Sequence, residues 1–449
     1  MLLSTSLRIK AGEVLALIGA GGKTSTIARL IKELSPSIPV LATTTTHLGF
    51  EQRTITDQHV LTTDTEWKQQ VEGYLSEGQS VLLTAPANGE GKWTAPSDQD
   101  LKDTCHTLRG KQGVLLIEAD GARSRALKAP AAHEPVIPPF TTVTVLVAGT
   151  RALGKPLSGE SVHRPELAGP LMGLKPGETI ESRHVAQLLT SPAGGLKGVP
   201  AGSVVRCILN IAEQEAWEAT SQDLARMLLE EARILSVLLC SLDMSSPTRA
   251  VYGRTGCVIL AAGGSKRFGR QKLLEPWRGE PLIRLAVQTA LQTEASPVVV
   301  VTGAEGDRLM EALSGLSVEY VHNPHWREGQ SESLRLGLAA VRDRVEAVIF
   351  MLGDMPLVES ALVEALIEEH RGTLAPVIAP GYNDRPGNPV LFDRSSFDAL
   401  DAVRGDQGGR AIYDRYPPRL VEWGASASID IDSLEDLRRL NSDSTGGMS

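Results

Sequence analysis

Short apolar runs recur along the chain, and most of them end in glycine or polar residues before a helical pattern begins. Residues 13–19 (EVLALIG) form the first run. Within residues 24–34 the apolar side chains are three or four positions apart, at Ile27, Leu30, Ile31 and Leu34. A run followed by this spacing predicts a buried strand and then an amphipathic helix. Further strands are predicted in the first half at residues 39–47, 80–86, 113–122 and 141–149.

The same alternation starts again in the second half. Residues 222–240 have a long helical pattern, and the polar, turn-rich residues 243–256 follow it. New strands are then predicted at residues 257–262, 297–303, 347–354 and 375–380. We therefore predict a first domain at residues 1–245, a linker at 246–254 and a second domain at 255–449, both of the α/β class with largely parallel sheets.

Composition narrows the function classes. The chain has 449 residues, 42% of them hydrophobic, and a formal net charge of −9. This negative charge argues against an extensive nucleic-acid-binding surface, so any cluster of basic residues must be local. The four cysteines, at positions 105, 207, 240 and 257, form no C-x-x-C pair, and buried thiols are expected rather than disulfides or an iron–sulfur site.

Targeting signals are not evident in the sequence. Residues 1–13 lack the long apolar core of a signal peptide, and no apolar stretch approaches the roughly 20 residues that a membrane helix needs. We expect a cytoplasmic protein without a membrane partner.

A loop in the second half combines small residues with positive charge. The strand at 257–262 runs into a glycine-containing turn, and the residues of interest are Ala261, Ala262, Gly263, Gly264, Ser265, Arg267 and Lys272. Small residues let the backbone approach a ligand, and Arg267 and Lys272 would neutralise a pyrophosphate leaving group. The loop predicts a polyphosphate site; a surface turn with solvated bases is the alternative.

Acidic residues follow later strands of the same half. Gly353 and Asp354 follow the apolar run at 347–352, at the end of a strand where open α/β sheets bind ligands. Asp430 and Asp432 are two positions apart and would point the same way from an extended segment. We predict that Asp354 and Asp432 hold Mg²⁺ together. Helix caps are the alternative role for these aspartates.

The motifs of this half resemble those of the molybdenum cofactor nucleotidyltransferases, which are MobA-like. The pattern L-A-A-G-x-S-x-R-x-G-x-x-K matches from Leu260 to Lys272, with Phe268 where methionine is usual. GDMP at 353–356, GNPVLF at 387–392 and DIDSLEDL at 430–437 follow in the family's order. The resemblance implies a Rossmann-like fold of the nucleotide-diphospho-sugar transferase type.

The resemblance also implies the reaction. The phosphate of Mo-molybdopterin would attack the α-phosphorus of CTP, with pyrophosphate leaving and Arg267, Lys272 and Asp354 as catalytic residues. Ala262 marks the cytidylyl-transferring subgroup, and Gln330, Ser331 and Ser333 are expected to hydrogen-bond the base; a helix N-cap is the other role for Ser331. Guanylyl transfer or sugar-phosphate activation is the alternative.

The first half contains its own glycine loop between a strand and a helix. Gly19, Gly22, Lys23 and Thr24 fit a short G-x-x-G-K-T pattern, whereas the longer G-x-x-x-x-G-K-[ST] pattern fails because Leu17 is not glycine. We predict a P-loop-like site for ATP or GTP, with Mg²⁺ on Thr24 and Asp120; Glu118 is a second candidate ligand. A simple glycine turn capped by Thr24 is the alternative.

Basic residues follow these acids, namely Arg123, Arg125, Lys128 and His133, and suit a second anionic substrate. Together with TTTTH at 43–47 and EADGA at 118–122, the loop resembles the selenium-dependent hydroxylase accessory family of the YqeC type. The resemblance implies a nucleotide-binding module that serves an apo molybdenum hydroxylase. The residues leave open whether it is a nucleotide-gated cofactor carrier or a kinase or ligase.

Overall fold

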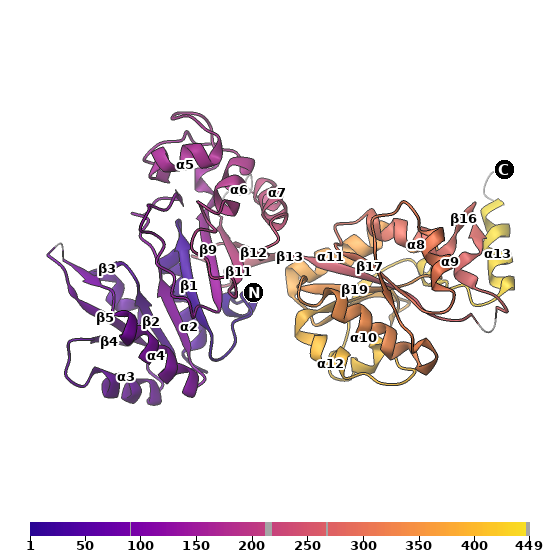
Figure 1. Cartoon of the computed structure of the whole chain (residues 1–449), viewed down its shortest axis with the longest axis horizontal. Coiled ribbons are helices and arrows are strands. Elements are labelled where there is room, and N and C mark those ends of the chain that lie inside the picture. Colours follow the sequence, from indigo (N-terminus) through magenta and orange to yellow (C-terminus); the bar gives the residue numbers. More distant parts are fainter. Residues whose placement is uncertain (90, 212–217, 266–267, 446–449) are drawn as a thin grey trace. The chain divides into compact units, whose positions relative to one another are not determined.

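The computed structural model describes residues 1–89, 91–211, 218–265 and 268–445, and of residues 218 and 441–445 it describes only the backbone. The chain forms two compact units, Met1–Tyr252 and Gly253–Ser449 (Figure 1). Residues 248–253, within the predicted linker, form strand β13 (Thr248–Gly253). Within the described parts, no helix is long and apolar enough to cross a membrane.

The first unit is built on a large sheet in which parallel pairs dominate. Its order is β13-β12-β11-β9-β1-β7-β2-β5-β6-β3, with β4 also paired to β5. The strands are β1 Val14–Gly19, β2 Val40–Thr44, β3 His47–Gly49, β4 Gln58–Leu61, β5 Val81–Ala87, β6 Lys92–Thr94, β7 Val114–Glu118, β9 Val143–Gly149, β11 Val204–Asn210 and β12 Ile234–Cys240, with β8 Leu127–Lys128 and β10 Val162–His163 paired apart from it. The helices are α1 Leu3–Ser6, α2 Lys23–Leu34, α3 Trp67–Ser76, α4 Asp98–Gly110, α5 Pro165–Met172, α6 Ser182–Thr190 and α7 Glu218–Leu229.

Strand β1 lies at the centre of this sheet, between β9 and β7, and is parallel to both. Leu17 is paired with Glu118 and Gly19 with Val147. The carboxyl ends of these strands therefore meet at one edge, which brings the glycine loop after β1 beside the residues that follow β7. This is the edge at which parallel α/β sheets bind ligands.

The sequence pattern predicted most of these elements. The side chains of Ile27, Leu30, Ile31 and Leu34 are buried along one face of α2, as the spacing indicated. The helical pattern assigned to residues 222–240 was wrong in its second part, because α7 ends at Leu229 and Ile234–Cys240 is strand β12. A short apolar run fits a buried strand as well as a helix, and pairing with β11 decides between them.

The second unit contains a smaller mixed sheet of order β18-β17-β14-β19-β22-β20-β21, with β23 paired to β20. Strands β14, β17, β18 and β19 are mutually parallel, and β22 is antiparallel to β19 and β20. The strands are β14 Thr255–Ala261, β17 Val298–Thr302, β18 Glu319–His322, β19 Ala347–Leu352, β20 Val377–Tyr382, β21 Arg385–Pro386, β22 Val390–Asp393 and β23 Arg419–Glu422, with a separate hairpin of β15 Pro276–Trp277 and β16 Glu280–Pro281. The helices are α8 Leu282–Leu291, α9 Gly306–Ala312, α10 Gln330–Val341, α11 Ser360–Thr373, α12 Phe397–Asp401 and α13 Leu434–Thr445.

Two hydrophobic cores cover the two faces of this sheet. Cys257 and Ile259 of β14 belong to the core that includes α8, α9 and α11, whereas Val258 belongs to the core that includes α10 and α12 (Figure 1). Alternating residues of a strand point to opposite faces, so a nearly continuous apolar run is required here. All four cysteines are buried free thiols, as predicted.

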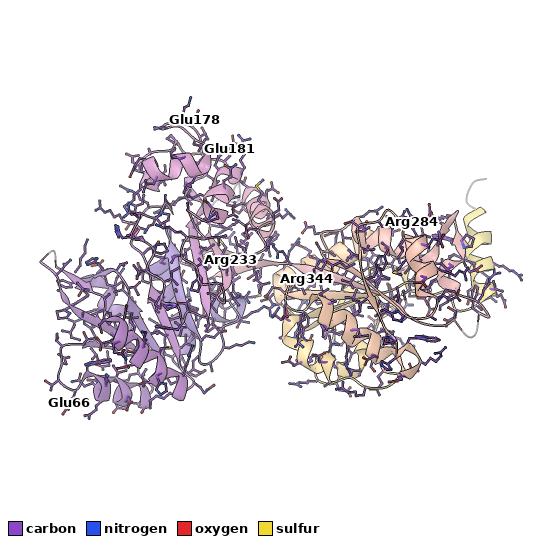
Figure 2. All side chains as sticks on the ribbon, in the orientation of Figure 1. Glu66, Glu178, Glu181, Arg233, Arg284 and Arg344 are labelled. Atoms are coloured by element: carbon purple, nitrogen blue, oxygen red, sulfur yellow. The ribbon has the colours of Figure 1, made fainter. Side chains whose placement is uncertain are left out.

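Charged side chains lie mostly on the outside of each unit. Glu66, Glu178 and Glu181, for example, are exposed at the surface of the first unit (Figure 2). The acidic net charge is therefore spread over the surface of the two units.

Candidate functional sites

The glycine loop of the first unit has a backbone that only glycine supports. Gly21 has φ +81°, and a Cβ there would lie 2.5 Å from the backbone nitrogen of Gly149. The first backbone hydrogen bond at this end of α2 runs from Thr26 N–H to the Gly22 carbonyl, and no described backbone carbonyl accepts from the N–H groups of residues 23–25. These donors and the positive end of the helix dipole suit an anion.

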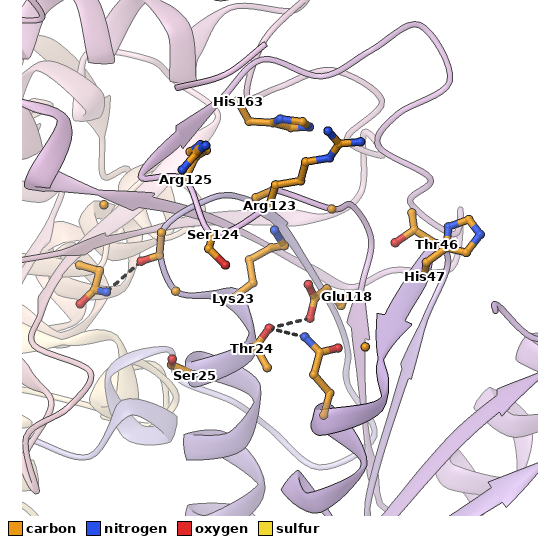
Figure 3. A pocket seen from close by; sticks show the side chains of 18 of the residues that line it. Lys23, Thr24, Ser25, Thr46, His47, Glu118, Arg123, Ser124, Arg125 and His163 are labelled. Atoms are coloured by element: carbon orange, nitrogen blue, oxygen red, sulfur yellow. Dashed lines mark hydrogen bonds between the residues drawn. The ribbon is translucent and has the colours of Figure 1, made fainter. Parts of the chain in front are cut away.

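Lys23 and Thr24 both face the pocket at this loop (Figure 3). The Lys23 ammonium lies 2.6 Å from the Gly19 carbonyl oxygen and 3.0 Å from Asp120 Oδ1. The N-cap position of α2 is Gly22, without a side-chain cap, so Thr24 does not cap the helix. Its hydroxyl instead donates to Glu118 Oε2 at 3.2 Å and accepts from Gln52 Nε2 at 2.9 Å.

Asp120, predicted as a metal ligand, does not line this pocket. Its side chain is buried, accepts the Gly19 N–H at 3.0 Å, and forms ion pairs with Lys23 and Lys128. The acid beside Thr24 is Glu118. The sequence offered both Glu118 and Asp120 as magnesium ligands, and the ion pairs of Asp120 distinguish it from Glu118.

Glu118 is a buried carboxyl group in a pocket that is also lined by six lysine and arginine residues and by three other acids, Glu51, Glu134 and Asp243. Burial raises its pKa, although Lys23 and the Thr24 hydroxyl act in the opposite direction. An added cation would favour the ionised form, so Glu118 and Thr24 fit a magnesium ion whose remaining ligands are phosphate and water. The described residues contain no cluster of three or more metal-ligating side chains.

A chain of buried ion pairs supports the floor of the pocket. Lys128 contacts Asp120 at 3.0 Å and Glu134 at 2.7 Å, and Glu134 also contacts Arg164 at 2.7 Å. Charges of alternating sign thus run from Lys23 to Arg164. Burial raises the pKa of Glu134, but its bonds to Arg164 and Lys128 outweigh this effect and lower the pKa from 4.5 to about 2.

This lowered pKa predicts an acid-dependent loss of stability. The ionised Glu134 stabilises the fold above its unfolded pKa of 4.5, and that contribution is lost as the pH falls toward 2. The melting temperature of Glu134→Gln should therefore lie below that of wild type at neutral pH, with the gap narrowing as the pH is lowered from about 5 to about 3. Differential scanning calorimetry of the full chain measures this gap. Exposed Glu66→Gln is the control, and a gap for Glu134→Gln that stays constant with pH would contradict the prediction.

The loop of the second unit is held by a residue that no motif singled out. Gln271 is buried, and its Nε2 donates to the carbonyl oxygens of Gly263 and Ala304 at 3.1 and 3.3 Å. Its Oε1 accepts the Ser265 hydroxyl at 2.9 Å. Ser265, predicted to bind ligand, lines the cavity, and its hydroxyl also accepts the Lys272 N–H.

The two glycines of this loop, Gly263 and Gly264, are small for different reasons. A Cβ at Gly264 would lie 2.7 Å from the Trp326 ring, so the indole covers that position. A Cβ at Gly263 would meet nothing within 4 Å, which leaves its backbone open to the cavity. Ala261 and Ala262 line the same cavity, of about 660 Å³. Arg267 lies outside the described residues.

Lys272, Asp354 and Asp432 meet in this cavity. The Lys272 ammonium is 2.5 Å from Asp354 Oδ2 and 3.0 Å from Asp432 Oδ1. Burial lowers the pKa of Lys272, but the two carboxylates outweigh it and raise the pKa above its ordinary value. Asp354 Oδ1 is buried and has no hydrogen-bond partner within the described residues.

Tertiary contacts bring the two aspartates together. Leu260 pairs with Leu352, so Asp354 follows the strand next to the loop. The Ile431 N–H donates to the Asp354 carbonyl at 3.1 Å, and the Ile431 side chain packs with Phe268 and Trp277. Asp432 is thereby placed on the far side of the Lys272 ammonium.

Helix capping, the alternative role, falls to other residues. The helix after Asp354, α11, has Glu359 at its N-cap position. At the start of α13, Ser433 and Asp436 exchange the capping hydrogen bonds. The carboxylates of Asp354 and Asp432 instead both contact the Lys272 ammonium. Together with the buried Asp354 Oδ1, they offer oxygen ligands that fit Mg²⁺.

Trp326, Gln330 and Ser333 line the part of the cavity at which the base is predicted to bind. Ser331 is buried and does not line this cavity; it also does not cap α10, whose N-cap position is Gly329. Gln330 and Ser333 lie on the cavity side of the same helix turn, since positions three apart share a face.

Comparisons with known proteins match parts of the two units separately. A family model described as "YqeC protein" matches residues 15–166, and one described as "MobA-like NTP transferase domain" matches residues 257–420. "Uncharacterized protein YqeC" of Escherichia coli (strain K12) is 32% identical over 194 residues, covering 43% of this chain and 73% of the relative.

Two further relatives each match about two fifths of the chain. "Nicotine blue oxidoreductase" of Paenarthrobacter nicotinovorans is 31% identical over 194 residues, covering 41% of this chain and 94% of the relative. "Molybdenum cofactor cytidylyltransferase" of Escherichia coli (strain K12) is 29% identical over 186 residues, covering 40% of this chain and 92% of the relative. The names of these two relatives describe different reactions.

Proposed function

The chain belongs to two families, with a YqeC domain in its first unit and a MobA-like NTP transferase domain in its second, and from this premise we propose that it is a molybdenum cofactor cytidylyltransferase fused to a nucleotide-binding accessory module. The second unit makes the protein a nucleotidyltransferase. In the proposed reaction it transfers CMP from CTP to Mo-molybdopterin and releases pyrophosphate.

One observation carries this proposal: the small-residue loop, Lys272 and the two carboxylates surround one cavity. The exposed backbone at Gly263 suits a triphosphate, and Lys272 supplies positive charge where charge develops on the leaving pyrophosphate. When Mg²⁺ is held by Asp354 and Asp432, it supplies further charge to the phosphate oxygens.

The protein's own residues then act mainly by positioning. Gln271 holds the loop in its open-backbone shape, and Trp326 fixes one wall of the base side. The attacking phosphate of Mo-molybdopterin is already ionised, so a general base is not needed. Arg267 is proposed to grip phosphate beside Lys272.

The choice of CTP is supported by Ala262 and by the cytidylyltransferase relative. With Mo-molybdopterin and Mg²⁺ present, the protein should release pyrophosphate from CTP at least about tenfold faster than from GTP. A factor of about ten corresponds to a modest difference in binding free energy. Mass spectrometry should then find molybdopterin cytosine dinucleotide. A preference for GTP would replace the cytidylyl assignment by a guanylyl one.

The oxidoreductase relative defines the main competing function. A redox reaction releases no pyrophosphate, so the same assay separates the two. The cluster of Lys272, Asp354 and Asp432 favours nucleotidyl transfer. Its two carboxylates suit a metal ion that binds the triphosphate.

The first unit is proposed to bind ATP or GTP at a P-loop-like site and to serve an apo molybdenum hydroxylase. The free amide groups at the start of α2, together with Lys23, Thr24 and Glu118, support nucleotide binding. Equilibrium binding of a fluorescent ATP or GTP analogue to wild type and to Thr24→Val tests this site, and equal affinities would contradict it.

A further inference from the structure

The cavity that contains the phosphate loop of the first unit has a second basic wall. Its volume is about 760 Å³, which is large within the range of small-molecule pockets. Besides the loop, it is lined by Arg123, Arg125, Arg151 and His163 (Figure 3). In that view the Arg123 and Arg125 side chains lie across the cavity from Thr24.

Arg123 and Arg125 differ from the other basic residues nearby in their ion pairing. Within the described residues, no acidic side chain forms an ion pair with Arg123 or Arg125, whereas Arg164 nearby is paired with Glu134. Arg151 donates to the Ser124 carbonyl at 2.6 Å, which ties it to the same loop. Six lysine and arginine residues line this cavity against four acids, Glu51, Glu118, Glu134 and Asp243, so its formal charge is positive in a protein of net charge −9, which favours an anion.

The backbone beneath them is held in an uncommon shape. Arg123 has φ 48° and Ser124 φ 58°, so two consecutive non-glycine residues are left-handed. Such backbone persists where the surroundings determine it, and it is concentrated at functional sites. Here the adjacent support is the ion-pair chain through Lys128, whose ammonium also donates to the Gly121 carbonyl.

His163 adds a polar group that is not charged at neutral pH. Burial lowers its pKa, and Arg164, Lys128 and Arg123 lower it further. A neutral imidazole beside guanidinium groups donates or accepts a hydrogen bond without adding charge. The wall therefore offers planar, forked donors and one neutral group, a combination suited to a phosphate.

We propose that Arg123, Arg125 and Arg151, with His163, form a second subsite that binds the phosphate of a small phosphorylated molecule opposite the nucleotide. The inference rests on the proposed nucleotide site at the start of α2 and extends it. The first unit then holds two substrates in one cavity.

Calorimetric titration of the full chain tests the subsite with inorganic phosphate as the probe. The non-hydrolysable analogue AMP-PNP or GMP-PNP and Mg²⁺ are present at saturation, so that the γ-phosphate position is filled. Wild type should still bind phosphate, and Arg123→Gln/Arg125→Gln should bind it at least about tenfold more weakly, as expected for lost charge-assisted hydrogen bonds. Affinity for the analogue itself should change less than about threefold, since these arginines face the other ligand.

The control removes two positive charges elsewhere in the same unit, with exposed Lys102→Gln/Arg109→Gln on α4. Its phosphate affinity should equal that of wild type. Equal phosphate affinity in wild type and the arginine variant, or no phosphate binding by wild type, would overturn the subsite. If neither analogue binds wild type, the nucleotide proposal fails. Phosphate titration without nucleotide then decides the subsite by the same comparison.

Discussion

Replacing Asp354 by asparagine is expected to lower kcat/KM for cytidylyl transfer by about a thousandfold or more, the scale of losing a metal-supported electrostatic contact. The neutral amide keeps the shape of the side chain but offers a single weak oxygen ligand. Lys272 keeps its ion pair with Asp432, so the cavity should stay folded. Steady-state pyrophosphate release measures the loss, and circular dichroism checks the fold.

Asp414→Asn provides the matched control. Asp414 is exposed in the same unit, and its replacement removes the same charge outside the cavity. This control should retain wild-type rates. If Asp354→Asn kept more than about a tenth of the activity, the residue would not be part of the charge-stabilising site.

The second large effect concerns Lys272. In Lys272→Met we expect turnover to fall by about a hundredfold, because positive charge at the leaving pyrophosphate is lost. Binding of a divalent ion to the nucleotide-free protein should instead become tighter, since Asp354 and Asp432 lose the ammonium that lies between them. Electron paramagnetic resonance with Mn²⁺ measures this affinity directly.

These opposite directions separate the proposed role from a structural one. A lysine that only stabilised the fold would weaken both turnover and metal binding when removed. Arg308→Met, which removes an exposed charge on α9, should change neither. Weaker Mn²⁺ binding in Lys272→Met would contradict a shared carboxylate site.

Local patterns gave much of the fold. The apolar runs placed the main strands, because a strand buried on both faces must be apolar almost throughout. The glycine loops were also predicted from the sequence, and in the structure a Cβ would meet the Gly149 backbone at Gly21 and the Trp326 ring at Gly264. Where local pattern was ambiguous, as at Ile234–Cys240, pairing in the sheet decided the outcome.

The site residues, like the fold, were predicted only in part from the sequence. Residue types and motif order were enough to nominate Lys23, Thr24, Lys272, Asp354 and Asp432, because each lies beside a strand end or a loop whose chemistry is local. The sequence did not indicate that Gln271 holds the loop. It also did not decide whether Glu118 or Asp120 lies beside Thr24. Nor did it show that Gln330 and Ser333 line the cavity whereas Ser331 does not.

The sequence by itself determined two α/β halves, each with a loop of small residues after a strand, because strand burial and glycine backbone are properties of neighbouring residues. Only the tertiary structure decided which charges meet. Lys272 and Asp432 are 160 positions apart, and they touch because Ile431 packs beneath the loop and bonds to the Asp354 backbone. Contact at that separation is set by how apolar surfaces pack, which no local pattern encodes.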